Sequence, residues 1–217
     1  MKALRFSDRA HAGRELAARL GEYAGRDDVL VLALPRGGVP VGYEIARHLR
    51  APLDVMIVRK LGVPGSEELA MGAIASGGFR VMNPDVLSSV HISDEKLNSS
   101  IALGQRELER RESSFREGRP PLEIAGRTVI LVDDGIATGA TMRAAARAVR
   151  AQNPALLVIA TPVAAPETLR ALENEAAEVI AVLAPSSLSA IGEWYLDFTQ
   201  TSEEEVRSLL AKTRTQA

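Results

Sequence analysis

Two adjacent carboxylates, Asp133 and Asp134, stand at the point of this sequence best suited to chemistry. They follow the apolar run 129–132, which predicts a strand buried on both faces. They precede residues 135–141, Gly-Ile-Ala-Thr-Gly-Ala-Thr, which open an Ala/Arg-rich helix. Two carboxylates beside a helix start would repel a phosphate unless they bind something else. Sugar hydroxyls or a magnesium ion with its waters are suitable partners for that charge.

Residues 135–141 themselves have the features of an anion site. Gly135 and Gly139 allow a close backbone approach or a positive φ, and a helix N-terminus offers unpaired N–H groups. Thr138 and Thr141 add hydroxyl donors. The plainer alternative is an ordinary capped turn between a strand and a helix. A dinucleotide-binding loop and a P-loop both fit poorly, because neither G-x-G-x-x-G nor G-K-[ST] is present.

A second loop of the same kind follows the apolar run that ends at Leu34. Its residues Gly37 and Gly38 expose backbone amides, Arg36 supplies a fixed positive charge, and Pro40 suits the first turn of a helix. A simple turn is the alternative for this loop taken alone. Its position after another predicted central strand favours a second anion site.

A third candidate is the pair Arg59 and Lys60, at the end of a predicted strand. Residues 61–80 are rich in glycine and predict a long mobile loop, with a short strand near 70–75. The two cations could neutralise charge on a departing pyrophosphate, and the loop could order as a lid when ligand binds. Two ordinary exposed cations at a strand end are the alternative.

The elements that position these loops alternate between helix and strand. Apolar runs bounded by turns predict strands at 29–34, 53–58, 129–132, 155–161 and 178–183, and amphipathic segments predict helices at 9–23, 40–49, 93–117, 139–151 and 166–174. This order is typical of an α/β, doubly wound and mostly parallel sheet of about five strands, with helices on both faces. Ligands bind such sheets at the carboxyl ends of the strands, where both loops lie.

Composition agrees with an ordinary globular protein of 217 residues, 46% hydrophobic and 25% charged, with a formal net charge of −2. Without cysteine, disulfides and thiolate metal sites are excluded. No run of clustered Lys and Arg residues indicates binding to nucleic acid. No segment has the pattern of a membrane span or of a secretory leader, so we expect a cytoplasmic location. We expect one domain over 1–217.

The segment 133–141 resembles the phosphoribosyl-diphosphate-binding motif of type I phosphoribosyltransferases, and the likeness extends over about 29–183. The resemblance implies transfer of a 5-phosphoribosyl group from phosphoribosyl diphosphate to a nucleobase or similar acceptor, with Mg²⁺ as cofactor. It implies that Asp133 and Asp134 hold the ribose and contact magnesium indirectly, and that Arg36 and Lys60 assist catalysis. The implied substrate-binding residues are Arg36, Gly37, Gly38, Arg59, Lys60, Asp133, Asp134, Gly135, Ile136, Ala137, Thr138, Gly139, Ala140 and Thr141.

The same resemblance implies a small hood over the base, which we expect from the N-terminal region and about 184–217. Trp194 and Tyr195 are the candidates for stacking on a base there, with packing of the hood as the alternative. Enzymes of the family that use 6-oxopurines carry an Asp where this chain has Ala137, which speaks against hypoxanthine or guanine as acceptor.

Two further questions stay open at this stage. One alternative is a regulatory protein that senses phosphoribosyl diphosphate or a nucleotide on the same fold, and another is a phosphatase or other small-phosphate enzyme that reuses the loop. Helix 93–117 carries many paired charges typical of a solvated surface, and Leu97, Ile101 and Leu108 on it are the candidates for a homodimer contact.

Overall fold

A five-stranded parallel sheet forms the body of the protein. A computed structural model describes residues 5–90 and 92–214. The strands run in the order β2-β1-β6-β7-β8, and each neighbouring pair is parallel. Their bounds are β1 Val29–Ala33, β2 Leu53–Val55, β6 Thr128–Val132, β7 Leu156–Val163 and β8 Glu178–Leu183. The predicted α/β fold is confirmed.

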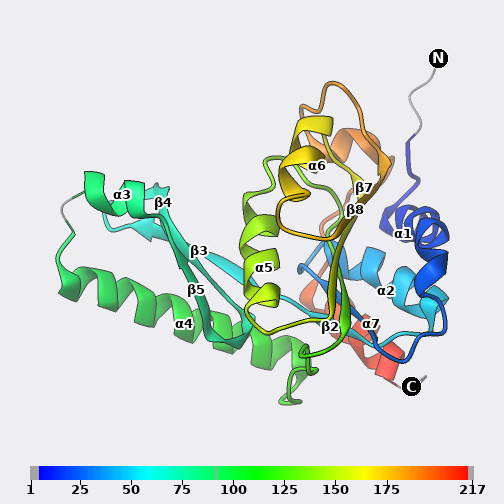
Figure 1. Ribbon diagram of the computed structural model, residues 1–217, viewed down its shortest axis with the longest axis horizontal. Coiled ribbons are helices and arrows are strands. Elements are labelled where there is room, and N and C mark those ends of the chain that lie inside the picture. Colours follow the sequence, from blue (N-terminus) through cyan, green and yellow to red (C-terminus); the bar gives the residue numbers. More distant parts are fainter. Residues whose placement is uncertain (1–4, 91, 215–217) are drawn as a thin grey trace.

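Helices cover both faces of this sheet (Figure 1). On one face lie α1 Arg9–Ala17, the 3₁₀ segment Ala18–Tyr23, α2 Gly38–Leu49 and α7 Glu203–Arg214; on the other lie α5 Ala140–Arg150 and α6 Pro166–Leu172. Strands β1 and β6 are buried at every position, because they lie in the middle of the sheet under both helical layers. No described helix is long and apolar enough to cross a membrane.

Residues 58–90 and 92–116 form an arm that projects from the body (Figure 1). It consists of the antiparallel sheet β3-β4-β5 and two helices, with bounds β3 Val58–Val63, β4 Ser66–Ala75, β5 Phe79–Met82, α3 Pro84–Ser89 and α4 Asp94–Arg116. The prediction of a long glycine-rich loop at 61–80 is therefore wrong, as is the single strand over 53–58. The chain leaves the parallel sheet after Val55 and enters the arm at Val58.

Close packing explains why glycines occur inside the arm. A Cβ on Gly104 of α4 would lie 2.8 Å from Leu61 Cδ2 and 2.9 Å from Ile74 Cδ1. A Cβ on Gly72 would lie against the backbone of β5. In a strand, glycine often marks such a close approach and not a loop. Leu97, Ile101 and Leu108 of α4 pack within the chain's own core, with Leu108 fully buried.

A buried ion pair fastens the arm to the body. Arg116, at the end of α4, donates from Nε to both carboxylate oxygens of Asp54 in β2, at 3.0 and 3.1 Å, and from Nη2 to Val55 O at 3.0 Å. Both side chains are almost fully buried. Asp54 also accepts from the Leu122 backbone N–H at 3.1 Å. The end of the long helix is thereby fixed to the edge strand.

The terminal regions do not stay together. Residues 191–198 lie against the N-terminal segment, and Phe6 and Tyr195 form a parallel bridge. Helix α7 instead packs along α2 and β2, where Val206 and Leu210 are fully buried. Both parts reach the candidate site described below, residues 191–198 beside the N-terminal segment and α7 through Glu203 at its start.

Replacing Arg116 with Met should lower the free energy of unfolding by about 3 kcal/mol, because the nearly fully buried Asp54 carboxylate loses its guanidinium partner. Arg110→Met on the same helix is the matched control, since Arg110 is exposed and pairs with Glu107 at the surface. Its effect should be much smaller, because solvent screens an exposed pair. Urea unfolding of both variants measures the difference, and equal losses would contradict the assignment.

Candidate functional site

The two loops singled out in the sequence meet because their strands are neighbours. Strands β1 and β6 pair in register, with Ala33 opposite Val132. Parallel strands end at the same edge of a sheet, so the turn after Leu34 and the residues after Val132 emerge side by side. The Leu34 N–H donates to Val132 O at 2.8 Å, which continues the pairing into the loops.

The glycines of the first loop let it touch the acidic pair. A Cβ on Gly37 would collide with the carboxylate of Asp134, and one on Gly38 would lie 2.8 Å from Val132 O. Neither glycine has a positive φ, so backbone conformation does not explain them. The lack of space for a side chain explains them. Any side chain at Gly37 would displace the carboxylate of Asp134.

A cleft of about 280 Å³ opens between the loops and the root of the arm. Three predicted site residues, Arg36, Asp133 and Thr141, line it together. No described carboxylate pairs with the Arg36 guanidinium, so its charge is available to a ligand. The full lining is Leu34, Pro35, Arg36, Met56, Ile57, Val58, Arg111, Phe115, Asp133, Thr141 and Glu203.

The segment 135–139 presents free backbone donors at the start of α5. The N–H groups of Ala137, Thr138 and Gly139 donate to no group in the described part of the chain. Gly139 has a φ of 74°, which turns the chain into the helix and favours glycine. Thr168 holds the loop from behind by donating to Ala137 O at 2.8 Å. This arrangement can bind an anion through its amides.

Asp133 and Asp134 lie against the glycines of the Arg36 loop on one side and lead into the amides of 137–139 on the other. Asp133 accepts from the Asp134 backbone N–H at 2.9 Å, and its carboxyl lines the cleft. Burial raises the pKa of Asp133 well above its ordinary value, and the neighbouring charge of Asp134 raises it further. Asp134 forms an ion pair of 2.6 Å with Arg9.

Lys60 and Arg59 point to opposite faces of β3, as consecutive strand residues must. Lys60 lines a second hollow of about 400 Å³ between the arm sheet and α5, which shares Val58 and Thr141 with the cleft. Arg59 extends over α4, where its Cδ lies near Gly104. Of the two predicted cations, Lys60 therefore lies next to the Thr141 end of the site, and Arg59 lies against the arm helix.

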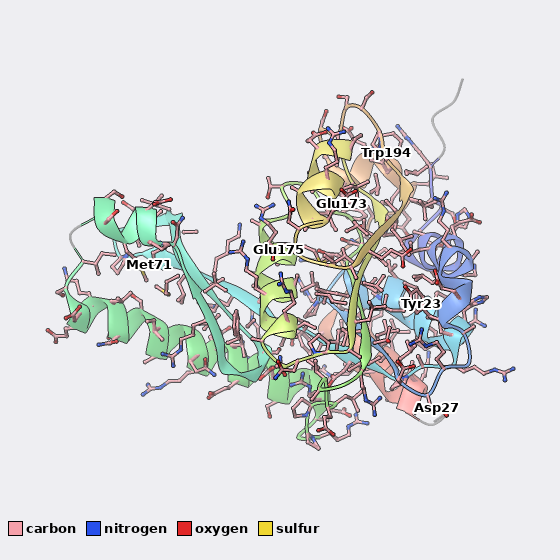
Figure 2. The ribbon with its side chains drawn as sticks, viewed as in Figure 1. Tyr23, Asp27, Met71, Glu173, Glu175 and Trp194 are labelled. Carbon is pink, nitrogen blue, oxygen red and sulfur yellow. The ribbon has the colours of Figure 1, made fainter. Side chains whose placement is uncertain are left out.

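The two aromatic candidates differ in their surroundings. Tyr195 is buried, and its hydroxyl donates to Asp134 O at 2.5 Å. Burial raises the pKa of this phenol above its ordinary value, so it remains a donor. Trp194 is half-buried at the end of the body away from Met71 of the arm (Figure 2), and its buried Nε1 donates to no described group. Tyr195 therefore supports the acidic pair and does not present its ring to a base.

Sequence reasoning missed Arg9, Arg111 and Glu203. Arg9 contacts Asp134 across 125 positions of the chain, and Arg111 and Glu203 enter the cleft lining from α4 and α7. None of them belongs to a local motif. The charged pattern of α4 favoured a solvated surface for Arg111, and only the packing of the arm on the body brings it to the cleft.

A magnesium ion held by protein groups alone has no cage here. Across residues 5–90 and 92–214, no three His, Cys, Asp or Glu side chains gather as a metal site. Magnesium commonly keeps several waters and binds through one or two carboxylates together with substrate phosphates. Asp133 and Asp134 fit that mode, in which the ion would arrive with an anionic ligand.

Comparison with known proteins identifies the class. The Phosphoribosyl transferase domain family matches residues 5–184. The chain belongs to this family, which bears out the resemblance seen in segment 133–141.

Two relatives place the chain more closely within the family. It is 45% identical over 205 residues to a Mycobacterium tuberculosis protein (strain H37Rv), named only provisionally as a phosphoribosyl transferase. That match covers 94% of this chain but 46% of the relative, so the chain spans about half its length. The solved structure of the protein TT1426 from Thermus thermophilus is 42% identical, with a TM-score of 0.83 over 96% of this chain and 98% of that one.

Replacing Gly37 with Ala should destabilise the fold by roughly 1–3 kcal/mol, because the new methyl group overlaps the Asp134 carboxylate. Gly21→Ala is the control, since no atom lies within 4 Å of the methyl group it adds. Thermal unfolding of the two variants should differ clearly. Equal melting temperatures would show that the loops are not in contact.

The pH dependence of stability should report on Asp133. Its raised pKa means that the folded protein holds a proton which the unfolded chain has released above about pH 4. Stability is therefore lost progressively as the pH rises from there towards the folded-state pKa of this carboxyl. Asp133→Asn keeps an acceptor for the Asp134 N–H and cannot ionise. Its melting temperature should equal that of the wild type below about pH 4 and exceed it increasingly as the pH rises above that value; a constant difference would contradict the shift.

Proposed function

We propose that this chain transfers the 5-phosphoribosyl group of phosphoribosyl diphosphate to a nucleobase or a similar small acceptor, with release of pyrophosphate. The observation that supports this most is the meeting of three groups at one sheet edge. These are the amides of 137–139, which donate to no described group, the acidic pair, and Arg36, which pairs with no described carboxylate. They match in order the phosphate, the sugar and the diphosphate of such a substrate. The family supports the reaction type, and the acceptor is part of the proposal.

Each group has a separate task in this proposal. The amides of 137–139, with the Thr138 and Thr141 hydroxyls, bind the 5′-phosphate at the start of α5. Asp133 and Asp134 accept hydrogen bonds from the ribose hydroxyls. Gly37 and Gly38 let the Arg36 turn lie against this pair, so the diphosphate and ribose sites adjoin.

The cations around the cleft serve the leaving group. The Arg36 guanidinium binds the diphosphate through two parallel N–H donors. Arg111 adds a second guanidinium on the α4 side of the same cleft, where Glu107 holds it at 3.2 Å. Lys60 lies on the neighbouring hollow and can reach a ligand at the Thr141 end.

The reaction needs little covalent help from the protein. The bond between the anomeric carbon and the diphosphate oxygen breaks, and its electron pair leaves with pyrophosphate. A lone pair of the acceptor forms the new bond to the anomeric carbon. The ribose becomes oxocarbenium-like in between, so positioning and electrostatic stabilisation are the main contributions. Magnesium, when bound, neutralises the diphosphate. The acidic pair orients the ribose, and Arg36 stabilises the charge that develops on the leaving group.

Binding of phosphoribosyl diphosphate with Mg²⁺ tests this proposal directly. Calorimetry should detect binding to the wild type, and at least about tenfold weaker binding to Asp134→Ala and Arg36→Lys. Lysine keeps the charge of Arg36 but loses its fork of donors, so this variant should melt within about a degree of the wild type. Arg14→Gln, an exposed position on α1, should bind as the wild type does.

The acceptor can be found by adding each nucleobase to the loaded protein and measuring released pyrophosphate. Binding without turnover with any acceptor would favour a sensor of phosphoribosyl diphosphate on this fold. Equal affinity in Asp134→Ala and the wild type would remove the acidic pair from the site. If Arg36→Lys instead melts many degrees lower and binds equally well, Arg36 is a structural residue.

A further inference from the structure

Arg9, at the start of α1, is the residue most closely tied to the acidic pair. Its Nε donates to Asp134 Oδ2 at 2.6 Å, and its Nη1 donates to Thr199 O at 2.6 Å. The guanidinium also lies over the Phe198 ring, 4.0 Å from its centre. Its side chain is only 11% exposed. Three different partners thus fix the orientation of a largely buried charge.

The N-terminal segment and residues 194–199 hold Arg9 in place together. The Phe6 N–H donates to Trp194 O at 2.9 Å, and the Leu196 N–H donates to Phe6 O at 2.8 Å. The Asp197 N–H donates to Ser7 O at 2.9 Å. These two segments bring Arg9 to the side chain of Asp134 and the Tyr195 hydroxyl to its backbone carbonyl. We call Arg9, Tyr195, Phe198 and Thr199 the Asp134 brace.

The brace engages one oxygen of the carboxylate and leaves the other available. Oδ2 of Asp134 accepts from Arg9, while both carboxylate oxygens lie against Gly37. No donor among residues 5–90 and 92–214 forms a hydrogen bond with Oδ1. A carboxylate fixed in this way cannot rotate freely towards the glycine turn or away from it. The Oδ1 atom of Asp134 therefore keeps one orientation.

We propose that Arg9 is a positioning residue for the phosphoribosyl site, which fixes Asp134 through Oδ2 so that Oδ1 faces a ribose hydroxyl. This inference rests on the proposed function, because it assigns Oδ1 to the sugar. Arg9 itself does not touch the substrate. It acts through Asp134, and it makes the N-terminal segment part of the site although no motif there indicates it.

The low exposure of Asp134 makes the brace important. Its side chain is only 14% exposed, so a charged carboxylate here needs a close partner of opposite charge. The Arg9 guanidinium supplies that charge together with a directed, charge-assisted hydrogen bond. Without it, Asp134 would turn towards solvent. A displacement of about 1 Å in a positioning group can reduce catalysis by about 100-fold.

A double-mutant cycle with Arg9→Gln and Asp134→Asn tests this role. Calorimetry with magnesium phosphoribosyl diphosphate should show at least about tenfold weaker binding to Arg9→Gln. The double variant should bind no more weakly than Asp134→Asn alone, because both changes remove the same contribution. Arg14→Gln, with the same substitution on the same helix and an exposed side chain, should stay within about twofold of the wild type. Arg9→Lys should recover part of the loss.

Two binding results would overturn the inference. One is wild-type affinity in Arg9→Gln. The other is a loss of binding free energy in the double variant equal to the sum of the losses in the two single variants, which a general structural role would give. A crystal structure of Arg9→Gln supplies a readout that needs no ligand. The Asp134 carboxylate should leave its place against Gly37, and an unmoved carboxylate would also overturn the inference. A wild type that does not bind the ligand would instead remove the proposed function, and the crystal structure would still decide whether Arg9 positions Asp134.

Discussion

The close approach between the turn at Gly37 and the carboxylate of Asp134 is the constraint on which the site depends. It arises from the sheet, because β1 and β6 are adjacent, parallel and in register up to Ala33 and Val132. Glycine at 37 and 38 is then required by space and not by backbone conformation. Since both loops rest on strands buried on both faces, neither can move far without disturbing the core. The geometry of the cleft is therefore set by the two buried strands of the sheet.

The arm adds a second, less central wall to the same cleft. Its long helix α4 brings Arg111 and Phe115 to the lining, and the buried pair between Arg116 and Asp54 fixes the end of that helix. Asp54 belongs to β2, the strand next to β1, so the arm is anchored one strand away from the Arg36 loop. A ligand that binds Arg36 and Arg111 at once would thus contact both the body and the arm. Changes at the arm root can reach the cleft through this anchor.

The sequence predicted the parallel sheet well, because its strands are continuous apolar runs separated by amphipathic helices of ordinary length. It also located both loops, since strand order places them at one edge. The arm was missed for a physical reason. The glycine-rich composition of residues 61–80 favours a loop, whereas Gly72 allows strand β5 to approach β4 closely. Local composition cannot distinguish a flexible glycine from one that makes room for a neighbouring element.

Arg9 shows the same limit at the site itself. A motif search finds residues that act together only when they are close in the sequence, and Arg9 lies 125 positions from Asp134. Its role depends on a further long-range event, the pairing of Phe6 with Tyr195, which seats the N-terminal segment beside the acidic pair. The motif 133–141 therefore specifies which groups can meet a phosphoribosyl ligand. The direction in which Asp134 presents its carboxylate is set by residues from both ends of the described chain, and it follows only from the assembled fold.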